Sequence, residues 1–189
     1  MTTDNNRVLI VGSVGLDAVS TPHGSVDRVL GGAASYSSVA ASFFAPVSMV
    51  GVVGRDFPPE NVALFESRGI DLSALEVREG ETFFWAGEYG EDPNQAITHA
   101  TDLNVFADFR PVLPASHCKL PYVFLANIDP ELQLEVLDQM ESPKFVAADT
   151  MNFWITGKKE QLLKVLGRVT LALMNDAEIR QLTGTPNLA

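Results

Sequence analysis

The stretch LGGAASYSSVAASFFAPVSMVGVVGRD, Leu30–Asp56, contains three features that together decide the fold. The Gly31-Gly32 pair allows a positive φ angle and a close approach of a ligand to the backbone. The small residues from Ala33 to Ser42 predict a helix that ends before Pro46, because the residue before a proline avoids the α region. The following run, VSMVGVVG, is typical of a strand buried on both faces. A glycine pair before a helix N-terminus suits a polar ligand, and the same residues also suit an ordinary tight turn.

The composition describes a globular protein of ordinary domain size. The chain has 189 residues, and a hydrophobic content of 46% is enough for a substantial core. A formal net charge of −11 without any basic run argues against nucleic acid and anionic membranes as partners, because both attract clustered lysine and arginine. The single cysteine, Cys118, fits a reducing compartment. With a polar N-terminus and no apolar run of ~18 residues, the sequence predicts a cytoplasmic protein.

Strand and helix patterns alternate along most of the chain. An apolar run from Arg7 to Val14 predicts a first buried strand, and Pro58-Pro59 favours the first turn of a helix. After Pro114, strand-like and helix-like runs alternate in the order PYVFLANID (121–129), PELQLEVLDQM (130–140), KFVAADT (144–150), GKKEQLLKVLGRV (157–169), VTLALMND (169–176) and AEIRQLTG (177–184). This spacing predicts βαβ units, and therefore an α/β fold with a mostly parallel central sheet and helices on both faces.

Two further segments have a different, β-rich pattern. TFFWAGEY (82–89) and AITHATDLNVF (96–106) are joined by GEDPNQ, which has the composition of a turn. Together with a hairpin-like excursion at about residues 18–29, these runs predict a small exposed sheet attached to the main body. Its aromatic side chains form an apolar face that a ligand, the body or another subunit must cover; they are Phe83, Phe84, Trp85 and Tyr89.

Acids and amides follow the apolar strands. They are Asp17, Asp56, Asn127, Asp129, Asp149, Asn175, Asp176 and Glu178. In an open α/β sheet the ligand crevice lies beyond the carboxyl ends of the strands, so these side chains are candidates to line one site. Asp and Asn are also the residues that cap helices, whatever the function. A crevice rich in carboxylates would require magnesium or a polyol as its ligand.

Several common site motifs are absent. The sequence has neither G-x-x-x-x-G-K-[ST] nor G-x-G-x-x-G, and Ser13 in V-G-S-V-G misses the nucleophile elbow by one position. His23, His99 and His117 have no metal-ligand spacing, and we expect them at the surface or in loops.

Four features occur in a fixed order along the whole chain. The predicted first strand ends in Gly15-Leu16-Asp17, Gly31-Gly32 leads a helix of small residues, and VGVVGRD (50–56) ends the second strand. The fourth is an N-x-x-E pattern at Asn175–Glu178, and the expected lid strands, at about 18–29 and 82–106, lie between these motifs. In this order the chain resembles the N-terminal portion of the ribokinase-like, PfkB-type carbohydrate kinases.

The resemblance implies phosphoryl transfer from magnesium-ATP to a hydroxymethyl group of a sugar, nucleoside or related polyol. Asp17 would bind acceptor hydroxyls, since one carboxylate accepts two hydrogen bonds. Gly31 and Gly32 would let the acceptor approach the backbone, and Phe84 of the lid would close over it. Tyr36 stands where the family commonly has asparagine, so the sugar contacts at this position must differ.

The phosphate side of the site is implied in the same way. Asn175 and Glu178 would organise magnesium and phosphate, and Asp149 resembles another strand-end position near the site. The family's G-A-G-D motif, which carries the catalytic aspartate and much of the ATP pocket, is absent and is expected downstream of Ala189. Residues 1–189 are therefore expected to form the N-terminal portion of one ribokinase-like domain, without its C-terminal part, and to be inactive alone.

Three other interpretations stay open. The chain could be a non-catalytic sugar-binding or regulatory module that keeps the acceptor cleft. The aromatic lid could serve mainly as a homodimer interface. The chain could also be a doubly wound domain of another use, since a fold alone does not define a function.

Overall fold

The structure, a computed structural model, describes residues 6–91 and 96–187 of the 189-residue chain. Its body contains a six-stranded sheet in which all paired neighbours are parallel, in the order β10-β9-β8-β1-β4-β5. The strands are β1 (Val8–Val11), β4 (Val47–Gly54), β5 (Asp71–Arg78), β8 (Tyr122–Leu125), β9 (Phe145–Asp149) and β10 (Leu171–Leu173). The helices are α1 (Ala33–Ala41), α2 (Pro59–Ser67), α3 (Pro130–Gln139), α4 (Asn152–Gly157), α5 (Lys159–Leu166) and α6 (Asp176–Thr183). This architecture confirms the predicted α/β fold.

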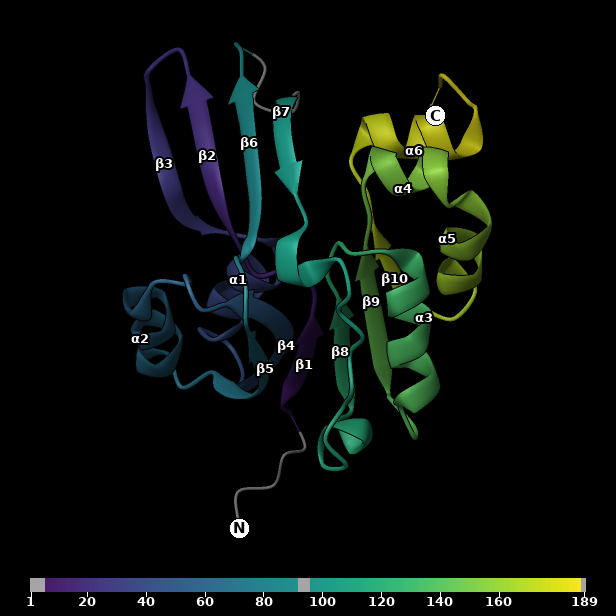
Figure 1. Cartoon of the computed structure of the whole chain (residues 1–189). Helices are drawn as coiled ribbons and strands as arrows, with labels where there is room; N and C mark the ends of the chain where they lie inside the picture. The colour runs from purple at the N-terminus through teal and green to yellow at the C-terminus, as the bar shows by residue number, and fades with distance from the viewer. Residues whose placement is uncertain (1–5, 92–95, 188–189) are drawn as a thin grey trace.

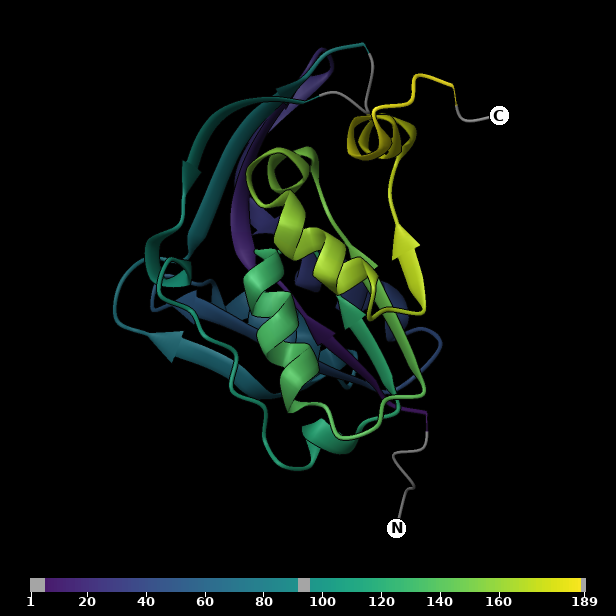
Figure 2. The same cartoon turned by 90° about the vertical axis from the view of Figure 1, so that its right-hand side faces the viewer.

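The sheet separates two hydrophobic cores. All eight residues of β4 are buried, as expected for a strand covered on both faces. On β1, Leu9 packs into the core beneath α3, whereas its neighbour Ile10 packs into the core with Phe65 of α2. Figures 1 and 2 show α3 and α5 on one face of the sheet and α1 and α2 on the other. The helices therefore cover both faces of the sheet. The carboxyl ends of its strands stay uncovered by these helices and face the second sheet.

A second sheet forms the lid. Its four strands have the order β3-β2-β6-β7, and β2 and β6 are parallel while the outer pairs are antiparallel. They are β2 (Gly15–Thr21), β3 (Gly24–Gly31), β6 (Phe83–Tyr89) and β7 (Ala96–Asp102). Figure 1 shows these strands extending beyond the carboxyl ends of β1 and β4. The structure confirms the predicted exposed sheet, while positions 92–95 of the expected GEDPNQ turn lie outside the described residues.

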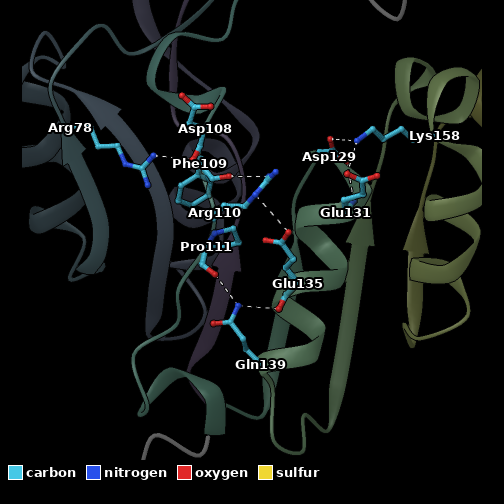
Figure 3. Close-up of polar contacts among 10 residues, drawn as sticks. All are labelled: Arg78, Asp108, Phe109, Arg110, Pro111, Asp129, Glu131, Glu135, Gln139 and Lys158. Carbon is cyan, nitrogen blue, oxygen red and sulfur yellow. Dashed lines mark hydrogen bonds and ion pairs between the residues drawn. The ribbon is translucent and has the colours of Figure 1, made fainter.

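The connection from the lid to β8 runs along the body and is held on two sides (Figure 3). On one side, Arg78 of β5 donates a hydrogen bond of 3.2 Å to the carbonyl oxygen of Asp108. On the other, Gln139 of α3 donates one of 2.8 Å to the carbonyl oxygen of Pro111. Phe109 between them is fully buried in the core beneath α3. The connection that follows the lid is thus attached to the sheet on one side and to α3 on the other.

Some local expectations were wrong. The first strand ends at Val11, so Asp17 belongs to lid strand β2 and not to the end of β1. Strand β5 and helix α4 were not anticipated. His117, expected at the surface or in a loop, lies in a short 3-10 helix with only 4% of its surface exposed. Its burial is compatible with a polar side chain because Nε2 lies 3.2 Å from a carboxylate oxygen of Asp71.

Candidate acceptor site at the carboxyl ends of the strands

The glycine pair packs directly against the segment that follows β1. Gly32 has a φ angle of 92°, and a Cβ atom there would lie 2.8 Å from the carbonyl carbon of Ser13. The first amides of α1 are already occupied, because Ala33 donates to Ser13 Oγ at 3.0 Å and Ala34 donates to the Ser13 carbonyl at 2.9 Å. These two amides are not free for a ligand, so the pair serves close approach of two chain segments.

Asp17 lies at the other glycine of the pair. A Cβ atom at Gly31 would overlap the Asp17 carboxylate, so only glycine leaves room for this side chain. Burial raises the pKa of Asp17 from 3.8 to about 6. Within residues 6–91 and 96–187, no group donates a hydrogen bond to this carboxylate. Asp17 is therefore a partly buried acid whose charged form has no protein partner in the described structure.

Tyr36 borders the same place. Its hydroxyl donates a hydrogen bond of 3.0 Å to the carbonyl oxygen of Leu30, and 60% of the residue is exposed. Burial, followed by the charges of Asp17 and Tyr89, raises the pKa of Tyr36. The charge effect shows that the phenol and the carboxyl group of Asp17 are near neighbours. Together they form one corner of the candidate site.

A cavity of about 820 Å³ lies between the lid and the body. It is at the point where the chain order reverses across the sheet, between β1 and β8, which is the usual ligand position in such folds. The body contributes Ser13, Asn127, Ile128, Met151, Asn152, Phe153, Trp154, Thr156, Gly157 and Gln181. The lid and the connection that follows it contribute Phe83, Trp85, Thr98, Thr101, Leu103 and Phe106.

Phe84 lies elsewhere than we expected. It packs against the core that contains α1 and α2, and the guanidinium of Arg28 lies 6.0 Å from its ring centroid. Alternation along β6 places Phe83 and Trp85 on the other face, and both line the cavity. Phe84 thus attaches the lid to the body, while its two neighbours face the cavity.

Asp149, Asn175 and Glu178 are grouped at the ends of β9 and β10. Burial, and less strongly the charge of Glu178, raise the pKa of Asp149, although a hydrogen bond from the Thr150 amide acts against this shift. Asn175 and Glu178 form a capping box: Asn175 Oδ1 accepts from the Glu178 amide and Glu178 Oε2 accepts from the Asn175 amide, each at 2.9 Å. The capping box therefore explains why Asn175 and Glu178 occur at the start of α6 without any ligand.

The donor set near Asp149 is compatible with magnesium bound mainly by phosphate and water. Asp149 and Glu178 supply two carboxylates, and Mg²⁺ in nucleotide sites is held by one or two carboxylates plus phosphate oxygens. A cation there would offset the repulsion between the two charges. Across the described ranges, no three His, Cys, Asp or Glu side chains form a group able to hold a metal by themselves.

Two other strand-end acids have structural roles. Asp56 Oδ1 accepts hydrogen bonds of 2.7 Å from both the amide and the hydroxyl of Thr82, and Oδ2 pairs with Arg28 at 2.6 Å. Asp129 caps α3 by accepting from the Glu131 amide at 2.9 Å, and Lys158 Nζ lies 2.6 Å from its other oxygen (Figure 3). Asp56 thus links the lid, through Thr82 and Arg28, to the end of β4. Asp129 links the start of α3 to Lys158, the residue before α5.

Several residues that line the cavity carry no recognisable sequence signal. Asn127 was a candidate as a strand-end amide, but Ser13, Thr98 and Trp154 were not. The alternation of Phe83 and Trp85 could have shown that these two side chains share a face. No local signal places α4 beside the lid, because that contact depends on the whole topology.

Comparison with known proteins gives a consistent result. The family model "pfkB family carbohydrate kinase" matches residues 5–189. A cytidine kinase from Thermococcus kodakarensis is 24% identical over 189 residues, covering 96% of this chain and 66% of its own length.

Solved structures share the fold at low sequence identity. Ribokinase from Cryptococcus neoformans var. grubii in complex with ADP has a TM-score of 0.76 and 17% identity, covering 96% of this chain and 60% of that one. The nucleoside kinase of Burkholderia thailandensis in complex with inosine has a TM-score of 0.74 and 16% identity, covering 94% and 63%. This chain spans less than two thirds of the length of these relatives. With a family model that matches almost its entire length, the chain belongs to the PfkB family of carbohydrate kinases.

Proposed function

We propose that this chain forms the acceptor-binding part of an ATP-dependent kinase that phosphorylates a hydroxymethyl group of a sugar, nucleoside or related polyol. The observation that carries the proposal is the Asp17 carboxylate, which lies against Gly31 and has no hydrogen-bond donor among the described residues. A carboxylate can accept hydrogen bonds from two hydroxyls of a diol. The hydroxyl donors of a bound diol would stabilise the charged form of Asp17 and replace the water that burial removes from its carboxylate. Asp17 thus has the chemistry of a diol-binding group.

The surrounding residues complete the acceptor side. Gly31 leaves room for the Asp17 carboxylate, Gly32 lets the start of α1 approach the segment after β1, and Tyr36 borders Asp17. Phe83 and Trp85, in the place that we had assigned to Phe84, cover the acceptor from the lid. Their apolar surface would exclude water from the transferred phosphoryl group.

ATP and Mg²⁺ are the proposed co-substrate and cofactor. Bound Mg²⁺ would neutralise charge on the phosphates, and Asp149 and Glu178 would hold it through their carboxylates. Asn175 would orient Glu178 through the capping box. Glu178→Gln should lower the pKa of Asp149, which a pH titration followed by NMR would detect without any turnover. If the titration of Asp149 is unchanged, the two carboxylates do not share a cation site.

The catalytic aspartate is proposed to lie outside these 189 residues, because no G-A-G-D motif occurs in the sequence. Residues 1–189 would then be the N-terminal portion of one domain, which binds the acceptor without transferring phosphate. A non-catalytic sugar-binding module is the alternative, and the same absence of the motif favours it. The two differ in whether the protein isolated from its own cells releases ADP from ATP when acceptor is added.

The binding test uses the 189-residue chain and calorimetric titration. D-Ribose, D-fructose and the common ribonucleosides are the probes, and wild type is compared with Asp17→Asn. We expect saturable binding of at least one probe, weakened about 5-fold to 150-fold by the substitution, which corresponds to the ~1–3 kcal/mol of an unpaired polar group. Asp27→Asn, an exposed acid on β3, is the matched control. Binding that is equally strong in Asp17→Asn would contradict the proposal.

A homodimer through the lid is a separate proposal. The edge strands of the lid sheet are β3 and β7, and they carry exposed Val26, Val29 and Ile97. Exposed strand edges with apolar side chains readily pair with another chain. Light scattering should therefore give twice the chain mass for wild type and the single mass for Ile97→Asp. A wild-type monomer at high concentration would refute this interface.

A further inference from the structure

The lining of the lid cavity is mainly apolar and aromatic. Its aromatic side chains are Phe83, Trp85, Phe106, Phe153 and Trp154, and Leu103, Ile128 and Met151 extend the apolar surface. A monosaccharide carries hydroxyls around its whole ring, and each buried hydroxyl needs a partner. The cavity volume of about 820 Å³ lies within the range for sites that enclose complete organic ligands. The lining therefore fits a ligand with a flat apolar part in addition to its hydroxyls.

Two indole rings are held in place on the walls of this cavity. On the lid, Trp85 Nε1 donates to Thr98 Oγ1 at 3.2 Å, and the indole lies over Gly87, where any Cβ atom would collide with it. On the body, Trp154 Nε1 donates to Asn127 Oδ1 at 3.0 Å. Because each N–H group already has an acceptor, the ring faces are what the indoles offer to a ligand. Rings fixed before binding lose little conformational entropy when a planar group stacks on them.

The Asp17 carboxylate lies on the same face of the lid sheet as these rings. Asp17 and Trp85 are direct neighbours in the parallel pairing of β2 with β6, and side chains in register point to the same side. Neighbouring strands are about 4.8 Å apart, so one small molecule can contact both residues. Asp17 does not itself line the cavity, so the β2–β6 pairing is what places the proposed diol-binding group beside the stacking surface.

We propose that the acceptor is a nucleoside, with ribose hydroxyls on Asp17 and the base in the aromatic cavity beside Trp85 and Trp154. This inference rests on the proposed function and specifies its substrate class. Thr98 Oγ1 and Asn127 Oδ1 already accept from the two indoles, so the edge of the base would meet other polar groups on the cavity wall. These are the Thr101 hydroxyl, the Asn152 amide nitrogen and the Gln181 amide oxygen. A bare sugar is smaller and would contact less of the aromatic lining.

The chain contains a built-in reporter for this site. It has two tryptophans, and both line the cavity. Fluorescence excited at a wavelength selective for tryptophan should therefore change when adenosine, inosine, cytidine or uridine is added. Methyl β-D-ribofuranoside is the matched control ligand, because it keeps the ribose and the glycosidic bond and lacks the base. We expect at least one nucleoside to bind ten times or more tightly than this control.

Substitutions separate the two halves of the site, with affinities measured by calorimetry. Trp85→Ala should weaken nucleoside binding about 5-fold to 150-fold, the range for loss of one stacked base, and should weaken methyl riboside binding much less. Trp85→Phe keeps an aromatic face and should restore most of the affinity. Phe44→Ala, at a side chain that is 91% exposed and does not line the cavity, should change nothing. Circular dichroism of each variant establishes that it is folded.

The outcomes distinguish this inference from the proposed function. Equal affinity for nucleosides and methyl riboside, unaffected by Trp85→Ala but weakened by Asp17→Asn, would overturn the nucleoside assignment and leave the acceptor site in place. Failure of every nucleoside and sugar to bind a folded wild-type chain would overturn both.

Discussion

Asp17→Asn should stabilise the ligand-free protein while it weakens acceptor binding. Burial raises the pKa of Asp17 from 3.8 to about 6, so folding penalises the charged carboxylate. Between pH 3.8 and about 6 the folded state binds more protons at this site than the unfolded state, so the free energy of unfolding falls as pH rises. The loss is complete above pH 6 and absent below pH 3.8. The neutral amide of Asn at position 17 carries no charge to desolvate, so the substitution removes this loss of stability.

The magnitude follows from the shift. About two pKa units correspond to about 3 kcal/mol at 1.36 kcal/mol per unit, and partial exposure of the group reduces this to about 1–2 kcal/mol. Urea unfolding of wild type and Asp17→Asn at pH 4 and pH 7.5 measures it as a double difference, in which the other titrating groups cancel. We expect a stabilisation of that size at pH 7.5 that disappears at pH 4.

The control is Asp27→Asn, which changes an exposed carboxylate on the adjacent strand β3 and should give a double difference near zero. A stabilisation by Asp17→Asn that is the same at both pH values, or a destabilisation at pH 7.5, would refute the reasoning. Natural binding sites commonly sacrifice stability for function in this way.

Three further predictions concern the structure that supports the site. Gly32→Ala should lower the free energy of unfolding, measured by urea titration, by about 2 kcal/mol or more, because φ is 92° and backbone atoms lie under 3 Å from the added Cβ. The control Gly167→Ala, at a φ angle of −70°, should be nearly neutral in the same titration. Gln133→Leu should cost about 1–3 kcal/mol by chemical unfolding, because the buried amide donates to the carbonyls at the ends of β8 and β9. For Asp71, hydrogen bonds led by Ser73 outweigh burial and lower the pKa to about 2. Its stabilising effect is therefore present above pH 4 and lost as pH falls toward 2, so Asp71→Asn should destabilise at pH 7 and by less at pH 3.

The sequence was sufficient for the layers of the fold and insufficient for some of its elements. VSMVGVVG became the fully buried β4, because a continuous β-branched run has no polar face to expose. Strand β5 was missed because DLSALEVR mixes charged and apolar residues, as an edge strand of the sheet permits. Helix α4 was missed because NFWITG is short and rich in β-branched and aromatic residues with weak helix propensity.

The site was predictable in its chemistry and not in its contacts. The sequence indicated acids at strand ends, but it did not show that Asp17 lies on the lid against Gly31, since that contact depends on the register of β2 with β3. Alternation separates Phe84 from Phe83 and Trp85, yet only the packed structure shows which face meets the cavity. Asp56 turned out to fasten the lid, an interaction that requires the distant residue Thr82.

The most direct test of the acceptor site is a crystal structure of the chain with its tightest-binding acceptor. We expect two acceptor hydroxyls at about 2.5–3.0 Å from the Asp17 carboxylate oxygens, with the rest of the ligand in the cavity beside Trp85. A ligand bound elsewhere, or one that leaves the Asp17 carboxylate without a contact, would contradict it.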